Sequence, residues 1–175
     1  MYTIQYANYW SSVSACVYAP NLIICGGADN RGNICLPHIQ MQERMRVVME
    51  KKNIDWSNLG FGYVQTDYRY VSDFTKGAWD EGVLTKDADI VLNECAGVLQ
   101  YAQTIFEGLK AYTTEDGRIV TFRPDLNAER MMDSAARLEM PVFPKERFLD
   151  AVNQVVAANE AFVPPYGSGA TLYLR

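Results

Sequence analysis

The 175-residue chain has little histidine and no concentration of positive charge, and each shortage excludes a class of function. His38 is the only histidine, so a His-rich metal site is excluded, and any Ser-His-Asp or Cys-His catalytic set would have to use it. We expect His38 to be a solvated loop residue. The chain has 16 basic and 21 acidic residues, a net charge of −5, and no basic run. Nucleic acid and anionic membrane surfaces are therefore poor candidate partners.

Long apolar runs and regularly spaced cysteines are also missing. No apolar stretch approaches the roughly 18 residues that a membrane-spanning helix needs. The four cysteines match neither a CxxC metal pair nor a dense disulfide framework; they are Cys16, Cys25, Cys35 and Cys95. The first thirty residues contain no lysine or arginine, so they lack the basic region of an export signal. The sequence therefore predicts a cytoplasmic protein with reduced thiols.

The sequence changes character at about residue 48. The first forty residues hold three of the four cysteines, almost no charge and one short apolar run. We therefore expect residues 1–48 to be an extension outside the domain, weakly ordered or packed without a regular pattern. Residues 49–175 are expected to form the domain, because regular hydrophobic patterns begin there.

The pattern after residue 49 predicts strands followed by helices. Alternation predicts one or two strands over 60–74 and a short strand over 88–94. Helical spacing predicts a helix over 96–107 that ends at Gly108. Two apolar-rich runs around Asp116-Gly117 predict a β-hairpin.

Two further helices and a strand are expected after the hairpin. The first helix covers 125–140, with Asp125 and Asn127 as capping candidates and an apolar stripe of Leu126, Met131, Ala135 and Leu138. The second follows Pro144, with a stripe of Phe148, Val152, Val155 and Phe162. The alternating ending "ATLYLR" predicts a half-buried strand. This order of elements indicates an α+β fold.

Three groups of side chains could carry chemistry. The stretch "YAQTIFEGLKAY" gathers Tyr101, Phe106, Tyr112, Glu107 and Lys110, which could wall an apolar pocket or simply fill a core. An arginine at position 130, early in a helix, could clamp a phosphate or lie on the surface. Tyr173 and Arg175 share one face of the last strand. That face could line a pocket or could be exposed to solvent.

Three longer motifs follow one another along the chain: "FGYVQTDYRYV", "LQYAQTIFEGLKAYTTEDGRIVTFRPDLNAERMMDSAARLEMP" and "GSGATLYLR". Read together, they resemble the branched-chain amino acid aminotransferases. The combination of "FEGLKAY" with "FRPxLNxxRM" is more specific than either alone, and the match runs from about Met49 to Arg175. The resemblance implies the small N-terminal domain of the class IV pyridoxal-phosphate aminotransferase fold, also called the D-amino-acid-aminotransferase fold. Such a domain has a mixed or antiparallel sheet with packed helices.

The resemblance also implies roles for individual residues. Arg130 corresponds to the family's arginine for the cofactor phosphate. The residues that match the family's substrate pocket are Phe61, Tyr101, Phe106, Tyr173 and Arg175. An apolar aromatic pocket suits leucine, isoleucine and valine, because branched aliphatic side chains gain about 25 cal/mol per Å² on burial. The full-length family would transfer their amino group to 2-oxoglutarate with pyridoxal phosphate, as a homodimer.

No residue of this chain is assigned a catalytic role. Transamination needs a lysine that holds the cofactor as a Schiff base, and in the family that lysine lies in the larger C-terminal domain. Lys110 is not its equivalent, because it lies on a hairpin strand. We therefore expect the large domain to be absent, the segment alone to be inactive, and the last strand to have an unpaired edge. Pyridoxal phosphate is expected for the full-length family and is not assigned to this segment alone.

Two other interpretations remain open from the sequence. One is a relative of D-amino-acid transaminase or aminodeoxychorismate lyase, which share the fold. The other is a non-catalytic fragment that acts by binding or dimerisation.

Overall fold

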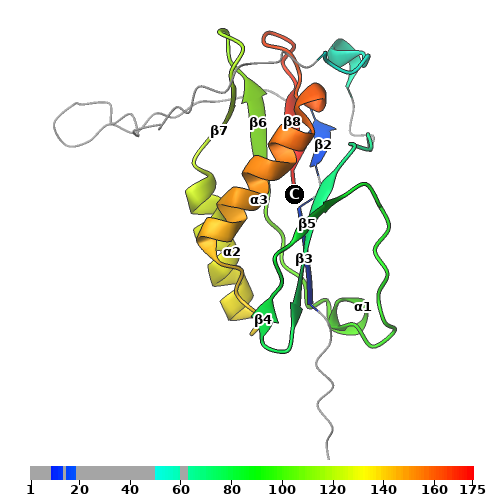
Figure 1. Cartoon of the computed structure of the whole chain (residues 1–175), viewed down its shortest axis with the longest axis vertical. Helices are drawn as coiled ribbons and strands as arrows, with labels where there is room; N and C mark the ends of the chain where they lie inside the picture. The colour runs from blue at the N-terminus through cyan, green and yellow to red at the C-terminus, as the bar shows by residue number, and fades with distance from the viewer. Residues whose placement is uncertain (1–8, 14, 19–49, 60–62) are drawn as a thin grey trace, which may run out of the picture.

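A computed structural model describes residues 9–13, 15–18, 50–59 and 63–175, with backbone alone for the first two ranges (Figure 1). His38 and Phe61 lie outside the described residues, so their predicted places stay predictions. Two antiparallel sheets and two longer helices make up the described fold. The α+β class is therefore confirmed.

The first sheet is built around β3 (Arg69–Thr75), which pairs with three other strands. These are β1 (Tyr9–Val13), β4 (Ala78–Trp79) and β5 (Val83–Thr85). The turn between β3 and β4 uses Lys76 and Gly77, both with positive φ. Trp79 in β4 packs edge-on against Phe143, with ring centroids 5.0 Å apart, and its indole N–H donates to the carbonyl of Val142 at 2.9 Å.

The second sheet has the strand order β2–β8–β6–β7, with every pair antiparallel. Its strands are β2 (Ala15–Tyr18), β6 (Leu109–Thr113), β7 (Ile119–Thr121) and β8 (Thr171–Leu174). Leu172 and Leu174 of β8 are fully buried, which confirms the apolar face predicted for the last strand; Thr171, predicted on the opposite face, is buried as well. The predicted hairpin is β6–β7. The expectation of an unpaired last strand is wrong, because β8 lies between β2 and β6.

The two longer helices are α2 (Pro124–Arg137) and α3 (Lys145–Ala158), and Figure 1 shows them side by side. Phe148, Val152 and Val155 of α3 are buried as the sequence predicted. Phe162 follows in the short 3-10 helix η2 (Glu160–Phe162) and is also buried. These side chains join the inward faces of β6 and β8 in one core.

Several local predictions are wrong. Residues 88–94 form no strand, because Ile90 and Val91 are exposed and pair with nothing in the described chain. The helix predicted over 96–107 is only α1 (Gly97–Tyr101), which ends where Ala102 takes a left-handed conformation. None of its residues is buried, so tertiary packing does not extend it.

Helix α2 also departs from its prediction at its start and along its apolar stripe. Arg123 occupies the N-cap, and Asp125 pairs with that arginine at 2.8 Å instead of capping the helix. Of the predicted stripe, Ala135 is buried and Met131 packs against the core, whereas Leu126 and Leu138 are exposed. Ala128, which was not in the predicted stripe, is also buried. The stripe is therefore confirmed at two of its four positions.

Contacts near residue 50 tie the start of the family-like segment to η2, which follows α3. The backbone N–H of Lys52 donates to the carbonyl of Ala161 at 2.9 Å, and Lys51 Nζ donates to the carbonyl of Glu160 at 3.0 Å. Two strands that precede residue 48 belong to the sheets: β1 pairs with β3 of the first sheet, and β2 pairs with β8 of the second. The boundary expected at residue 48 stays a prediction. Within the described residues, no helix is long and apolar enough to cross a bilayer.

Candidate functional site

The carboxylate of Glu107 accepts four hydrogen bonds from three residues, Arg130, Asn127 and Gly108. Arg130 donates to it twice, from Nε to Oε1 at 2.5 Å and from Nη2 to Oε2 at 2.9 Å. Asn127 Nδ2 donates to Oε2 at 2.7 Å, and the backbone N–H of Gly108 donates to the same oxygen at 3.2 Å. The two side-chain partners both come from α2, whereas Glu107 precedes β6.

Local structure explains why these groups meet. Asn127 and Arg130 are three residues apart in α2, a spacing that places both on one helix face. Glu107 ends the extended segment that leads into β6 at Leu109, so it reaches that face from the sheet side. Asn127 Nδ2 also donates to the carbonyl of Gly108 at 3.0 Å, which fixes the turn into the strand against the helix.

The carboxylate and the guanidinium have very different exposure. The Glu107 side chain is 9% exposed, whereas that of Arg130 is 63% exposed. Burial alone would raise the pKa of Glu107, but the hydrogen bonds from Arg130 and Asn127 outweigh it and hold the pKa below its ordinary value of 4.5. Glu107 is therefore ionised at neutral pH. The Arg130 guanidinium is exposed to solvent, whereas the Glu107 carboxylate that pairs with it is largely shielded.

Tyr173 lies next to this cluster through Gly108. A Cβ added at Gly108 would lie 2.4 Å from the Tyr173 hydroxyl, so only glycine leaves room for the tyrosine ring here. Tyr173 is on β8, opposite Lys110 of β6. The structure thus brings Tyr173, Glu107 and Arg130 into one contiguous region at the start of β6.

The other predicted pocket residues do not join them. Tyr101 is 84% exposed and Phe106 is 71% exposed. Arg175 is exposed at the last described position. The aromatic walls implied by the resemblance therefore do not close around a pocket within the described residues. Their predicted roles stay predictions.

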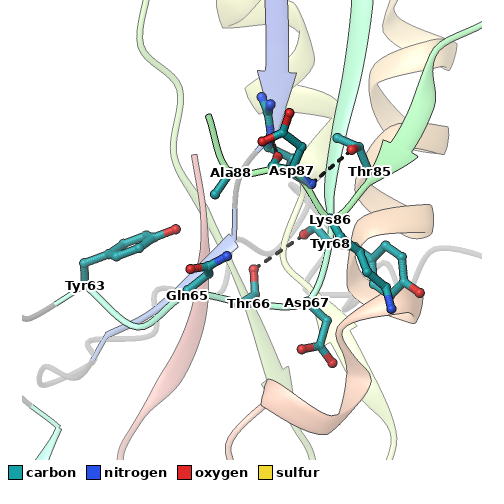
Figure 2. A pocket seen from close by; sticks show the side chains of 10 residues that line it. Tyr63, Gln65, Thr66, Asp67, Tyr68, Thr85, Lys86, Asp87 and Ala88 are labelled. Atoms are coloured by element: carbon teal, nitrogen blue, oxygen red, sulfur yellow. Dashed lines mark hydrogen bonds between the residues drawn. The ribbon is translucent and has the colours of Figure 1, made fainter. Parts of the chain in front are cut away.

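A small hollow lies at the edge of the first sheet, and Figure 2 shows its lining. Tyr63, Asp67, Tyr68, Thr85 and Lys86 are among the residues that line it. Its volume of about 30 Å³ has room for water but not for an amino acid or a cofactor. None of the predicted site residues that the structure describes lines it. No group of histidine, cysteine and carboxylate side chains that could hold a metal occurs in the described residues.

Sequence reasoning gave no role to two residues that the structure makes central. Glu107 appeared only as a member of an aromatic-rich stretch, and Asn127 only as a capping candidate. The available signal was the spacing of Asn127 and Arg130 within "LNAER", which predicts one helix face. The pairing of that face with Glu107 depends on the tertiary fold, so no periodic pattern in the sequence predicts it.

Comparison with known proteins relates the chain to aminotransferases, although no protein-family model matches it. A branched-chain-amino-acid aminotransferase of Haemophilus influenzae is 53% identical over 124 residues, 71% of this chain and 36% of that protein. One from Helicobacter pylori is 45% identical over 124 residues, again 71% of this chain and 36% of the relative. A methionine aminotransferase of Arabidopsis thaliana is 49% identical over 124 residues, 70% of this chain and 35% of that protein.

The class that these relatives share is amino transfer, so the matched segment is that of an aminotransferase. Within that class, the segment belongs to the branched-chain-amino-acid aminotransferase family, as its motifs predicted. The chain spans about a third of the length of the curated relatives it matches.

Proposed function

We propose that residues 49–175 form the small domain of a branched-chain aminotransferase and that Arg130 holds the phosphate of its cofactor. The observation that carries the proposal is the exposed guanidinium of Arg130, fixed by a buried carboxylate inside the most specific family motif. The complete enzyme would exchange an amino group between leucine, isoleucine or valine and 2-oxoglutarate.

The residues present fit a phosphate in part. Two nitrogens of Arg130 donate to Glu107, and the third, Nη1, makes no hydrogen bond to any residue of the described ranges. An arginine in this state can give a phosphate oxygen a charge-assisted hydrogen bond. A phosphate group offers three strong acceptor oxygens, so one side chain cannot satisfy it. The rest of the cradle would come from outside these residues.

Bound pyridoxal phosphate would supply the electron sink that amino transfer requires. In the proposed enzyme, Arg130 binds and orients the phosphate, and Tyr173 borders the substrate pocket. Phe61, Tyr101, Phe106 and Arg175 are proposed to border the substrate once a second domain covers them. That cover would remove their apolar surface from water, which suits a branched aliphatic substrate.

The proposal assigns no catalytic lysine to this segment, so the segment alone should not transaminate. The test is to assay leucine with 2-oxoglutarate and pyridoxal phosphate, using the chain by itself and the chain joined to the remaining two thirds of the Haemophilus influenzae relative. We expect no product from the first and glutamate from the second. A joined protein that folds but transfers no amino group would contradict the proposal.

Substrate competition in the joined protein separates the related activities. Leucine, isoleucine and valine should outcompete methionine and D-alanine. Methionine is included because one relative is named for it. Preference for D-alanine would favour a D-amino-acid transaminase.

We propose the cytoplasm as the location and a homodimer as the assembly. Some plant relatives are named as mitochondrial or chloroplastic, so cell fractionation is the appropriate test of the location.

The phosphate role of Arg130 has its own test in the joined protein. Arg130→Ala should remove a charge-assisted contact of about 2–3 kcal/mol, which corresponds to a loss of about 30- to 150-fold in cofactor affinity. Arg130→Lys should recover only part, because an ammonium cannot form a planar fork. Arg137→Ala, at the end of the same helix, is the control. Wild-type affinity in Arg130→Ala would leave Arg130 as a surface arginine.

A further inference from the structure

We infer that Glu107 is a positioning residue, whose carboxylate fixes the Arg130 guanidinium in the orientation that receives an anionic phosphate. The inference deepens the proposed function and rests on it, because the phosphate is that of the proposed cofactor. The family resemblance gave Glu107 no role. The inference comes from the geometry of the Glu107 carboxylate and its partners.

The carboxylate is held before any ligand arrives. Besides two hydrogen bonds from Arg130, it accepts from Asn127 Nδ2 at 2.7 Å and from the N–H of Gly108 at 3.2 Å. Four donors on two oxygens leave the glutamate little freedom to rotate. Because the Glu107 side chain is only 9% exposed and its oxygens accept four hydrogen bonds, it can hold the Arg130 guanidinium in one orientation.

The pairing leaves one end of the guanidinium available. Contacts to Glu107 use Nε and Nη2, so they engage one edge of the planar group. Arginine has a long side chain with large rotamer entropy, and the paired edge removes much of that freedom in the unliganded protein. When a ligand binds the remaining edge, less conformational entropy of the Arg130 side chain is lost. Pre-ordering therefore predicts that Glu107 strengthens phosphate binding.

Simple charge arguments predict the opposite sign. A carboxylate near a bound anion repels it, so removal of its charge should tighten phosphate binding if Glu107 acts only through its field. If Glu107 positions Arg130, Glu107→Gln should weaken binding although it removes a negative charge. The sign of the change in affinity thus separates the two roles.

The experiment uses the whole 175-residue chain labelled with ¹⁵N. The Arg130 Nε–H resonance is assigned by its loss in Arg130→Lys and then followed during titration with inorganic phosphate and with pyridoxal phosphate. Variants are Glu107→Gln, Glu107→Asp and Asn127→Ala. The matched control is Asp125→Asn, which breaks another two-point carboxylate–arginine pair at the start of the same helix.

We expect a sharp Arg130 resonance in the wild-type chain that shifts with both ligands at high concentration, because the rest of the phosphate cradle lies outside these residues and binding to Arg130 alone is weak. Glu107→Gln should broaden it and weaken binding by about two- to tenfold, the range expected when one side chain must be ordered on binding. Glu107→Asp should recover part of that loss, Asn127→Ala should weaken binding less, and Asp125→Asn should change nothing. Circular dichroism checks that each variant folds; if Glu107→Gln does not, Asn127→Ala and Glu107→Asp decide the sign.

Two outcomes overturn the inference and remain distinguishable. If the wild-type resonance shifts but the Glu107 and Asn127 variants bind equally well or more tightly, positioning is refuted while the phosphate role of Arg130 stands. If the wild-type resonance does not respond to either ligand, Arg130 does not bind phosphate in this chain and the inference is refuted. The amino-transfer assay of the joined protein then tests the proposed function separately.

Discussion

Asn159 should contribute more to the stability of this fold than any exposed polar residue of α3. Its side chain lies just after the helix, and the residue is 1% exposed. Its Oδ1 accepts from the backbone N–H of Tyr68 at 3.0 Å, and its Nδ2 donates to the carbonyls of Tyr68 at 2.9 Å and Val155 at 2.8 Å. One side chain thus joins the segment before β3 to the end of α3.

The magnitude follows from those three hydrogen bonds. Each contributes about 0.5–1.5 kcal/mol net, and a partner left buried without a bond costs about 1–3 kcal/mol. The N–H and carbonyl of Tyr68 would both lose their partner in Asn159→Ala, so we expect a loss of about 3 kcal/mol in the free energy of unfolding. At this chain length, that loss lowers the melting temperature by about 6–12 °C.

Urea and thermal denaturation of the chain measure this change, provided that unfolding is two-state by coincidence of two probes. Asn153→Ala is the matched control, because Asn153 lies on the exposed face of α3. It should be neutral or stabilising by a few tenths of a kcal/mol, since alanine is the better helix former. A loss below about 1 kcal/mol in Asn159→Ala would mean that water replaces the asparagine, and our account of its role would be refuted.

Three further predictions concern the second sheet and its cluster. Hydrogen bonds hold the pKa of Glu107 below 4.5 in the folded chain, so the stabilisation from its carboxylate is present above pH 4.5 and is lost as the pH falls through the lower folded pKa. The difference in unfolding free energy between wild type and Glu107→Gln should therefore shrink on acidification. A difference that does not change with pH would contradict this. Gly108→Ala should cost about 1–3 kcal/mol in chemical denaturation and displace Tyr173, visible as a changed tyrosine fluorescence, because the new methyl group overlaps the ring. Deletion of residues 1–18 removes β1 and β2 and exposes an edge of β3 and an edge of β8, so light scattering should detect more association than in the full chain. A monomeric deletion variant would show that neither edge needs cover.

Long, strongly patterned elements could be predicted from the sequence. The apolar stripe of α3 and the alternation of β8 each reflect burial of one continuous face, and both were confirmed. The Asp116-Gly117 turn reflects a local backbone requirement, because Gly117 has a φ of +77°. Such features leave a signal in neighbouring residues.

Features that depend on distant partners could not be predicted. Apolar residues at 90, 91 and 98 suggested a strand and a longer helix, yet they face solvent in the described structure, so pattern alone misjudged their burial. Arg130 was found through its motif, but its partner Glu107 was not, since an ion pair between a strand start and a helix has no periodicity. The same holds for the contacts between Asn159 and Tyr68, which lies 91 residues away in the sequence.

The pairing of β1 and β2 with different sheets has a consequence for the order of folding. Tyr9 pairs with Phe74, so β1 can find its partner once the first half of the sequence has been synthesised. Ala15 pairs with Leu174, so β2 cannot find its partner until nearly the whole printed sequence is available. Closing so long a loop costs more entropy and slows folding, whereas the β6–β7 hairpin and the α2–α3 pair form from nearby residues. We therefore expect β2 to dock last, onto a sheet that has already assembled, and the ribosome-bound chain to hold an open edge until then.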